Sequence, residues 1–372
     1  METEIEFRVP VTKILKVGPH PNADRLDIVT VFDFQVVTQR DKFKENDTCI
    51  LIPIDSILPN DVEAKLFGPD SKIKLTKGRV RQIRIRKFPS QGMIVSPTEL
   101  GLKNLEEGEN LAGELGITKY EPPAPQFQGT AAKKFRNKIW ENNYLHEYGG
   151  IQNWKWYPDL FEEGQDVVYQ EKIHGTNGRA GLLPYQPKTF WQRVKGWLGL
   201  NPEFQFAYGS NKVQLQSKSY TGYYEENIYA KACVQYGIEQ KLRPHETVYF
   251  EIFGPGIQKG YTYGVKEGEH QIVVFDVKVL APDKLSTRWL STVELESWCK
   301  ERDLPLVPYL YKGPHSKELA KQYTEGASVV GKQPIREGIV IKDPKETVSY
   351  IGKKYLKYLS AEYLDLDGTD FH

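Results

Sequence analysis

Apolar and polar positions alternate in short runs through the first third of the chain. Such runs occupy residues 11–17 (VTKILKV), 26–37 (LDIVTVFDFQVV) and 48–54 (TCILIPI), and residues 72–87 (KIKLTKGRVRQIRIRK) alternate most regularly. A period of two over four to eight residues is typical of half-buried β-strands. We therefore expect residues 1–115 to form a small β-barrel.

The pattern changes after Gly116. Residues 117–129 (ITKYEPPAPQFQG) contain three prolines and no periodicity, which indicates a linker over 116–130. Beyond it, strand-like runs at 246–254, 270–280 and 338–343 mix with helical stretches such as residues 291–303. These features predict an α+β domain over 131–372.

The composition and net charge mainly exclude classes of partner, site and location. The net charge is +1 with 27% charged residues, so overall charge names no partner. Three scattered cysteines form no C-x-x-C pair, which favours a reducing compartment. The acidic N-terminus is unlike a signal peptide, and no apolar run reaches the ~20 residues that span a bilayer. We expect a soluble, cytoplasmic monomer without a membrane partner.

Positive charge is concentrated in one segment of the predicted barrel. Residues 72–87 carry eight basic residues and no acidic one, and in a strand Arg84 and Arg86 would share one face. A cationic sheet face is suited to the nucleic-acid backbone. An edge strand protected by charge is the alternative. The expected nucleic-acid contacts are Arg79, Arg81, Arg84, Arg86 and Lys87.

A second unusual pattern lies at 167–181 (VVYQEKIHGTNGRAG). A run that begins with valines and is typical of a buried strand ends on Lys172, and a turn with two glycines follows. Burial lowers the pKa of a lysine amine and makes it a better nucleophile. A lysine that reaches solvent from a strand end is the alternative.

The surrounding motifs favour the nucleophile. The stretch from Lys172 to Asn177 resembles motif I of the covalent nucleotidyltransferases, in its RNA ligase form. Later segments resemble the other motifs in the family's order: YFEIFGPG with Glu251, VVFDVK with Phe275, REGIVIK with Glu337 and Lys342, and GKKYLKYLSAEYL. Five elements in the right order are far more specific than any one alone.

The resemblance implies a role for each residue. Lys172 would attack the α-phosphate of ATP, Phe275 would stack on the purine, and Glu337 and Glu251 would hold Mg²⁺ or Mn²⁺. Glu251 would alternatively accept hydrogen bonds from the ribose. The other expected nucleotide contacts are Glu171, Ile173, Gly175, Asn177, Arg179 and Lys342.

Motif V departs from the family pattern of K-x-K. Here Lys354 and Lys357 are three residues apart, so a bulge would be needed to bring both onto one face. We expect Lys357 and Lys354 to be catalytic by neutralising phosphate charge, with Lys353 as a competitor for the second role. The stretch AYGSNKV also places Lys212 where relatives often have an arginine, and we expect it to contact nucleic acid.

The order of the domains narrows the choice among the classes of covalent nucleotidyltransferase. Only 15 residues follow Lys357, too few for the C-terminal OB domain of DNA ligases and capping enzymes. Near the N-terminus, the stretch HPNADRL resembles the opening hairpin of OB-type tRNA-binding modules. An N-terminal OB-like barrel before an adenylyltransferase domain resembles the fifth family of RNA ligases.

That resemblance implies ATP-dependent joining of a 3′-OH RNA end to a 5′-phosphate, with nicked duplexes and RNA repair as the setting. Two alternatives stay open: a GTP-dependent capping guanylyltransferase, and a non-catalytic RNA- or tRNA-binding protein.

One segment lies outside the motifs. In residues 185–204 an apolar stripe at helical spacing is formed by Trp191, Val194, Trp197 and Leu198, with Arg193 and Lys195 elsewhere on the helix. We expect a helix packed on its own domain, and an element that stacks on or clamps RNA is the alternative.

Overall fold

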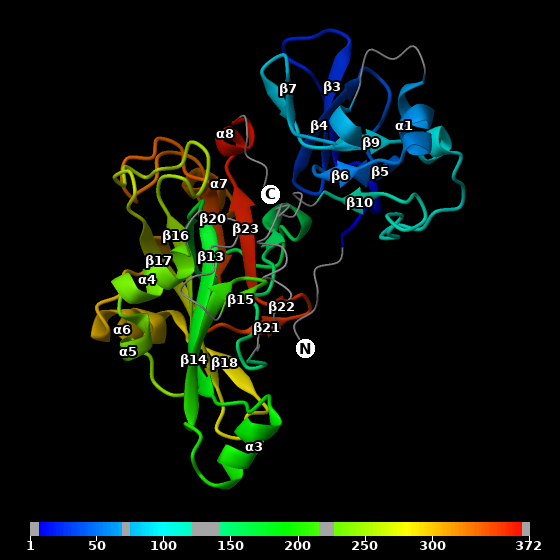
Figure 1. Ribbon diagram of the computed structural model, residues 1–372. Helices are drawn as coiled ribbons and strands as arrows, with labels where there is room; N and C mark the ends of the chain where they lie inside the picture. The colour runs from blue at the N-terminus through cyan, green and yellow to red at the C-terminus, as the bar shows by residue number, and fades with distance from the viewer. Residues whose placement is uncertain (1–6, 69–74, 121–141, 216–226, 367–372) are drawn as a thin grey trace. The chain divides into compact units, whose positions relative to one another are not determined.

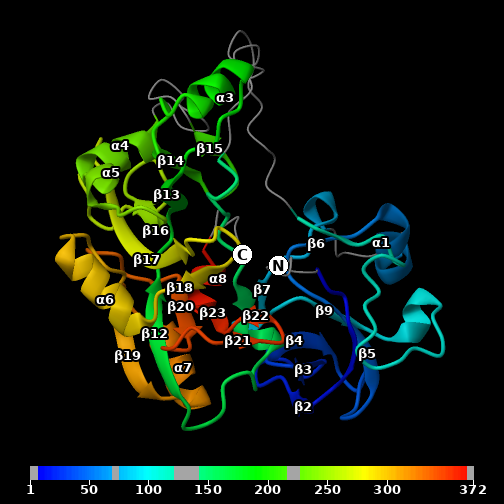
Figure 2. The same cartoon turned by 90° about the horizontal axis from the view of Figure 1, so that it is seen from below.

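Two compact units make up the chain in the computed structural model, which describes residues 7–68, 75–120, 142–215 and 227–366 (Figures 1 and 2). One unit comprises Glu4–Pro123, Gln152–Phe161 and the end of the chain from Ala361. The other comprises mainly Ala124–Ile151 and Glu162–Ser360. The expected division at 115 and 130 therefore needs two additions, because 152–161 and the residues after 360 join the N-terminal unit.

The N-terminal unit is built from short strands, as the alternating pattern predicts. Its strands are β1 (Val11–Lys13), β2 (Lys16–Pro19), β3 (Leu26–Val31), β4 (Phe34–Gln39), β5 (Thr48–Ile52), β6 (Ser56–Ile57), β7 (Ile83–Ile85), β8 (Phe88–Ser90), β9 (Met93–Val95), β10 (Thr118–Lys119) and β11 (Gln152–Asn153). Its helices are α1 (Asn60–Phe67), α8 (Ala361–Leu364) and the 3₁₀ turns η1 (Thr76–Gly78), η2 (Pro97–Leu100) and η3 (Trp154–Trp156).

These strands form antiparallel sheets in the orders β1-β5-β9 and β2-β3-β4, with the pairs β6-β10 and β7-β8. Strand β3 shows the expected alternation, because Val29 and Val31 are fully buried in a core that also contains Phe34. Trp156 packs edge-on against Phe34, with ring centroids 4.8 Å apart. This contact explains why residues 152–161 belong with the N-terminal unit.

The expected strand over 72–87 is mostly wrong. Lys72 and Lys74 lie outside the described residues, and only Ile83–Ile85 is a strand. Lys77 (φ +54°) and Gly78 (φ +68°) adopt left-handed backbone angles that turn the chain. A Cβ on Gly78 would lie 2.7 Å from the carbonyl oxygen of Leu58, so glycine is required there. At the start of the expected linker, Thr118–Lys119 pair with β6, and residues 121–130 lie outside the described residues.

The second unit is α+β, as predicted. Its strands are β12 (Asp166–Lys172), β13 (Thr176–Pro184), β14 (Phe204–Ser210), β15 (Gln214–Leu215), β16 (Glu246–Phe253), β17 (Gln271–Leu280), β18 (Thr287–Trp289), β19 (Tyr309–Pro314), β20 (Gly338–Lys342), β21 (Val348–Ser349), β22 (Gly352–Lys353) and β23 (Tyr355–Leu359). Its helices are α3 (Phe190–Trp197), α4 (Ile228–Gln235), α5 (Ile238–Lys241), α6 (Thr292–Glu301) and α7 (Lys317–Thr324).

Two antiparallel sheets organise this unit. One contains the order β23-β20-β12-β19, and the other is six-stranded in the order β15-β14-β13-β16-β17-β18. Helices α4, α5 and α6 cover one face of the six-stranded sheet, where Val248, Phe250 and Ile252 of β16 enter the largest apolar core. Since side chains alternate along a strand, Tyr249 and Glu251 point to the opposite face. The chain passes from one sheet to the other between Lys172 and Thr176.

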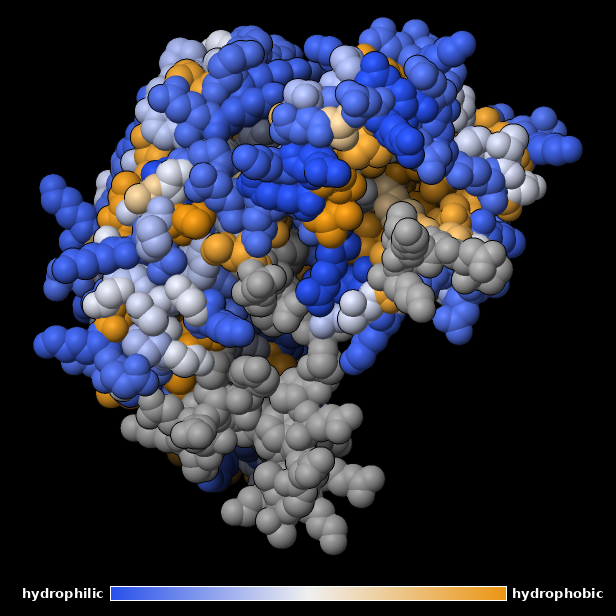
Figure 3. All heavy atoms as spheres, turned by 90° about the horizontal axis from the view of Figure 1, so that it is seen from above, coloured by the Kyte–Doolittle hydropathy of each residue, from blue (hydrophilic) through white to orange (hydrophobic). Residues whose placement is uncertain are grey.

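Within the described ranges, every helix is too short or too polar to span a lipid bilayer. Hydrophilic residues predominate on the face drawn in Figure 3, with smaller hydrophobic areas among them. Cys49, Cys233 and Cys299 are free thiols, and all three are buried.

Candidate active site

Lys172 and Glu337 form an ion pair at the point where the chain leaves the first sheet. Lys172 ends β12 opposite Gly338, the first residue of β20. A Cβ on Gly338 would lie 2.1 Å from the carbonyl oxygen of Tyr358, so the close approach of β23 requires glycine. Glu337 directly precedes it and is buried, and its Oε1 lies 2.6 Å from Lys172 Nζ.

The second carboxylate oxygen of Glu337 is less well satisfied. Among the described residues, Glu337 Oε2 is buried and has no hydrogen-bond partner. His174 Nδ1 lies 3.9 Å from this oxygen. His174 is held in place from two sides, because its backbone N–H donates to the hydroxyl of Tyr263 and its ring meets Tyr261 edge-on. A buried carboxylate oxygen without a donor is costly unless a ligand or ion satisfies it.

Glu251 lies beside this pair on the second sheet. It stands opposite Asn177 of β13, and the backbone N–H of Gly175 donates to its carboxylate. Burial raises the pKa of Glu251 to about 8; the charge of Lys172 opposes this shift and Glu337 adds to it. Glu251 is thus largely protonated at neutral pH in the free protein. Asn177 Oδ1 is also buried without a hydrogen-bond partner among the described residues.

The raised pKa gives a testable pH dependence. Because Glu251 ionises near pH 8, a reaction that needs its carboxylate should rise in kcat/KM between about pH 7 and pH 9 in the free protein. Its ionisation also disfavours the fold: the folded pKa lies above the unfolded value of 4.5, so this group's contribution to stability falls as pH rises between them. Glu251→Gln should remove both trends.

The measurements are the rate of covalent nucleotide transfer and the urea midpoint, each from pH 6 to pH 9.5. Asp283→Asn, on the turn after β17, is the matched carboxylate control. If Glu251→Gln keeps the wild-type rise in rate, another group is responsible for it.

Gly175 has a different role from the one expected. The motif resemblance implies that Gly175 contacts the nucleotide. A Cβ on Gly175 would lie 2.2 Å from the carbonyl oxygen of Ile252 and 2.9 Å from Glu251 Cγ. Glycine here therefore allows the chain to approach β16 and brings Lys172 and Glu251 together.

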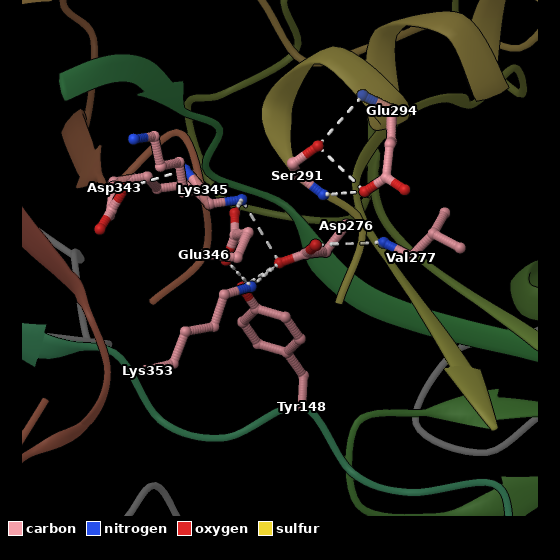
Figure 4. Close-up of polar contacts among 10 residues, drawn as sticks. Tyr148, Asp276, Val277, Ser291, Glu294, Asp343, Lys345, Glu346 and Lys353 are labelled. Carbon is pink, nitrogen blue, oxygen red and sulfur yellow. Dashed lines mark hydrogen bonds and ion pairs between the residues drawn. The ribbon is translucent and has the colours of Figure 1, made fainter. Parts of the chain in front are cut away.

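A buried cluster of charges lies on the same face of the second sheet (Figure 4). Asp276 of β17 has no exposed surface, and it pairs with Lys353 and, at 3.4 Å, with Lys342. Glu346 lies 2.8 Å from both lysine amines, and the hydroxyl of Tyr148 donates to Asp276 at 2.9 Å. The five side chains form one group joined by ion pairs and hydrogen bonds.

The charges of this cluster shift one another's pKa values. Burial would raise the pKa of Asp276, but Lys342 and Lys353 outweigh it and hold the pKa below its usual range. For Lys342, burial is outweighed by Asp276 and Glu346, and its pKa is raised. For Lys353, burial prevails over the same two carboxylates, with help from the charge of Lys342, and its pKa is lowered. Lys353 is therefore the amine in this cluster that loses its proton more easily.

The geometry distinguishes the lysines of motif V. In β23, Lys357 pairs with Val340 and lies on the same face as Lys172 and Lys342, two strands away from β12. Lys353 is four residues before Lys357, so the alternation of side chains places it on the same face, and its amine pairs with Asp276. Lys354, which we expected to be catalytic, has the opposite parity, and its Nζ donates to Gln165 Oε1 at 2.9 Å. The structure thus brings Lys353 to this face, and Lys354 away from it.

Phe275 lies next to the cluster at an irregularity in the sheet. The register between β16 and β17 shifts after Tyr249, so that Tyr249 pairs with Asp276 and Phe250 with Val274. This bulge leaves Phe275 unpaired. Its ring is partly exposed and meets Tyr148 edge-on, with centroids 4.9 Å apart. The exposed part of the ring is consistent with the expected stacking on a base.

The other expected nucleotide contacts are placed away from Lys172 or are buried. Glu171 points to the opposite face of β12, and its Oε2 accepts from the backbone N–H of Val329. Ile173 is buried. The buried guanidinium of Arg179 donates to the carbonyl oxygens of Ser210 and Leu145, so it supports the backbone. Lys212, which was expected to contact nucleic acid and not the nucleotide, is exposed on the turn between β14 and β15.

Sequence reasoning missed the groups that surround these residues. Asp276 could have been found, because an acidic residue in the apolar run 270–280 is unusual, and it follows Phe275 directly. His174 lies within the stretch that resembles motif I, whereas Tyr148 and Glu346 carry no comparable signal, since their contacts join segments far apart in the chain.

The expected nucleic-acid contacts of the N-terminal unit separate into two groups. Arg79 is buried, pairs with Asp55 at 2.6 Å and stacks on Tyr120, so its guanidinium is directed into the protein and not toward a nucleic acid. Arg84 pairs with Asp365. Arg81 is exposed outside a strand. Arg86 and Lys87 form the exposed turn between β7 and β8.

That turn is both strained and held in place. Arg86 (φ +49°) and Lys87 (φ +77°) have left-handed backbone angles, which cost about 1–2 kcal/mol per non-glycine residue. His20 Nε2 donates to the carbonyl oxygen of Ile85, and Asn22 Nδ2 donates to that of Arg86. The HPNADRL segment therefore holds a hairpin that carries two cations where glycine or asparagine is usual.

Comparison with known proteins agrees with this architecture. A model of the RNA ligase family matches residues 165–359, and a model of an OB-fold domain matches residues 8–98. A 120-residue part of the chain is 28% identical to the phenylalanine–tRNA ligase β subunit of Helicobacter hepaticus, which covers 30% of this chain and 14% of that protein. The chain thus spans about one seventh of this curated relative.

Solved structures match over nearly the whole chain. A lysine-to-alanine variant of Naegleria gruberi RNA ligase with ATP and Mn is 20% identical, with a TM-score of 0.71 and coverage of 96% and 98% of the two chains. The same ligase with pyrophosphate is 21% identical, with a TM-score of 0.70 over 97% and 98%. The expected OB domain and ligase fold are confirmed. Because its model covers more than half of the sequence, the chain belongs to the RNA ligase family.

Proposed function

We propose that this protein is an ATP-dependent RNA ligase that joins a 3′-OH RNA end to a 5′-phosphate end. The ion pair of Lys172 and Glu337 carries the proposal, because it lies inside the segment that matches the family and presents a lysine amine at the junction of the two sheets. The similar Naegleria gruberi ligase has been solved with ATP, with AMP and with pyrophosphate. ATP is the nucleotide of the proposed first step. AMP and pyrophosphate are the two parts into which ATP is divided when its α-phosphate is attacked.

The first step forms a bond between Lys172 Nζ and the α-phosphorus of ATP. The bond to the β-phosphate oxygen breaks, and pyrophosphate leaves. Lys172 must lose a proton before it attacks, and Glu337 Oε1 at 2.6 Å holds the amine until then. Lys357 and Lys353, on the same face, supply positive charge for the phosphate oxygens.

The second step uses the same amine as a leaving group, and the third step does not involve it. A 5′-phosphate oxygen attacks the phosphorus of lysyl-AMP, which frees Lys172 and leaves AMP on the RNA end. A 3′-hydroxyl then attacks that 5′-phosphate, and AMP departs as the new phosphodiester forms. Only the first two steps change a bond to Lys172, so the third should proceed without it.

A divalent ion fits the carboxylates. No three His, Cys, Asp or Glu residues in the described ranges gather into a metal site. Magnesium commonly binds one or two carboxylates and completes its coordination with phosphates and water. Glu337, with its unsatisfied Oε2, and Glu251 would hold such an ion, Mg²⁺ or Mn²⁺, which would offset phosphate charge. Asn177 Oδ1 is a further unsatisfied acceptor for a hydroxyl of the nucleotide.

The finer parts of the proposal concern the substrate. We propose nicked duplexes in RNA repair, with the protein acting as a monomer. The N-terminal unit supports a nucleic-acid substrate through the hairpin of Arg86 and Lys87, whose backbone strain is explained by the display of two cations.

The hairpin prediction is tested by salt dependence. Arg86→Gln with Lys87→Gln should weaken duplex binding about tenfold at 0.1 M salt and reduce the slope of log K against log[salt] by about 1.8, since each phosphate contact contributes about 0.9. Fluorescence anisotropy with a nicked duplex measures both values. Lys103→Gln, an exposed lysine of the same unit, is the control. An equal change in the control would assign the effect to overall charge.

The experiment that tests the function has two parts. Protein incubated with Mg²⁺ and either ATP or GTP, labelled at the α-phosphate, should acquire covalent label from ATP only. The labelled protein should then seal a nick with a 3′-OH RNA strand and a 5′-phosphate. Label from GTP would make the protein a capping guanylyltransferase, and no label from either would leave a non-catalytic RNA-binding protein.

A further inference from the structure

Helix α3 displays its aromatic side chains to solvent. The exposed fractions are 71% for Phe190, 72% for Trp191 and 87% for Trp197, and no residue of the helix is buried. The expectation that this helix packs on its own domain is therefore wrong. Leu198 and Leu200 continue the exposed apolar surface. Contiguous apolar surface of this kind marks an interaction site in a folded protein.

The helix is held in place by hydrogen bonds at its ends. Thr189 and Gln192 form a reciprocal capping box, and Gln192 Oε1 also accepts from the backbone N–H of Lys188. At the other end, Asn201 Nδ2 donates to the carbonyl oxygen of Gln192 at 2.7 Å. An eight-residue helix is unstable alone and usually depends on a buried face. Here its ends are stabilised instead, which keeps the aromatic face free.

Positive charge accompanies the exposed rings. Residues 185–202 contain Lys188, Arg193 and Lys195 and no acidic residue. Arg193 and Lys195 are exposed. Phe190, Arg193 and Trp197 are spaced i, i+3 and i+7, so the cation lies between the two rings on one helix face.

This arrangement favours RNA over a membrane. An interfacial membrane helix keeps its charges on the face opposite its apolar residues. A surface for single-stranded nucleic acid instead mixes rings, on which bases stack, with cations that contact the backbone. The face of Phe190, Arg193 and Trp197 has the second composition.

The position of α3 sets its distance from Lys172. Strand β13 begins with Thr176, four residues after Lys172, and ends with Pro184, just before α3. The helix therefore lies at the far end of the β13–β14 hairpin (Figure 1). Eight residue steps of a strand span about 26 Å. That length corresponds to about eight stacked nucleotides at 3.4 Å each.

We propose that α3 binds single-stranded RNA about eight nucleotides from the end that reacts at Lys172, by stacking bases on Phe190 and Trp197 and contacting phosphate with Arg193. This inference rests on the proposed RNA ligase activity, and it applies to RNA that is unpaired about eight nucleotides from the reacting end, not to a fully paired nick. It adds a substrate-length preference to the ligase: RNA too short to reach α3 gains nothing from the helix.

The test compares two RNA lengths in the full-length protein. For a 20-nucleotide single strand, Phe190→Ala with Trp197→Ala should weaken binding about 5- to 100-fold. Binding and joining of a four-nucleotide strand, and transfer of AMP to Lys172, should change less than about twofold. Trp197→Phe should bind like wild type and Trp197→Leu should bind like Trp197→Ala, because stacking needs an aromatic ring and not apolar area alone. Leu285→Ala, which removes another exposed apolar side chain, is the control.

Three results would overturn the inference: unchanged binding of the 20-nucleotide strand in the double variant, an equal loss for both lengths, or full binding by Trp197→Leu. Vesicles of phosphatidylcholine and phosphatidylserine test the membrane alternative, and vesicle binding lost in the double variant with RNA binding intact would establish it. Failure of the proposed function is seen separately, as wild-type protein that takes no label from ATP and joins neither length.

Discussion

Lys172→Ala is expected to abolish covalent labelling of the protein by ATP, a loss of at least about 10⁴-fold. Deletion of a covalent nucleophile has effects on this scale, because no neighbouring group can form the same bond. Of the other described lysines on this face, Lys342 and Lys353 are engaged with Asp276 and Glu346. The measurement is label from α-labelled ATP on a denaturing gel, after pyrophosphate treatment has removed any AMP already attached.

The three-step scheme makes this prediction sharper. Because the last step breaks no bond to Lys172, the alanine variant should still seal a nick whose 5′ end already carries AMP. Lys300→Ala, an exposed lysine on α6, is the matched control and should label normally. A urea titration guards against misfolding, since the variant leaves the buried Glu337 without its partner. Persistent labelling of Lys172→Ala would move the nucleophile to another residue.

The sequence predicted those parts of the site that depend on local pattern. Strand β12 is buried from Val167 to Glu171, as the run predicts, and Lys172 at its end is partly exposed. Gly338 follows Glu337 because β23 approaches β20 closely, which is a local steric demand. The order of motifs then identified Glu251, and the structure places it beside Lys172 through Gly175. Their chemical roles stay predictions until the activity is measured.

Pairings between distant segments were beyond sequence reasoning. Arg79 looks like its basic neighbours in the chain, but it is buried against Asp55 and Tyr120. Lys353 and Lys354 are adjacent, and only the strand parity and the position of Asp276 distinguish them. The stripe of α3 matched the pattern of a packed helix, although nothing covers it among the described residues. The period of the apolar positions indicates the type of secondary structure. It does not indicate whether the apolar face of an element packs against another part of the protein.

The second large effect is expected from Asp276→Asn, which should lower the free energy of unfolding by about 3–5 kcal/mol. Asp276 has no exposed surface, and it offsets two buried ammonium groups, Lys342 and Lys353. Removing one partner of a buried ion pair leaves an uncompensated charge, which is far more costly than removing a surface pair. Urea titration monitored by tryptophan fluorescence measures the loss.

The controls separate this cause from loss of side-chain volume. Glu296→Gln, at a surface pair with Lys312, should lose less than about 1 kcal/mol. Adding Lys353→Met to Asp276→Asn should restore part of the stability, because it removes the amine that was left without its carboxylate. If the double variant is less stable than Asp276→Asn alone, the packing of Lys353 against Trp289 outweighs its charge, and the electrostatic account of this cluster is wrong.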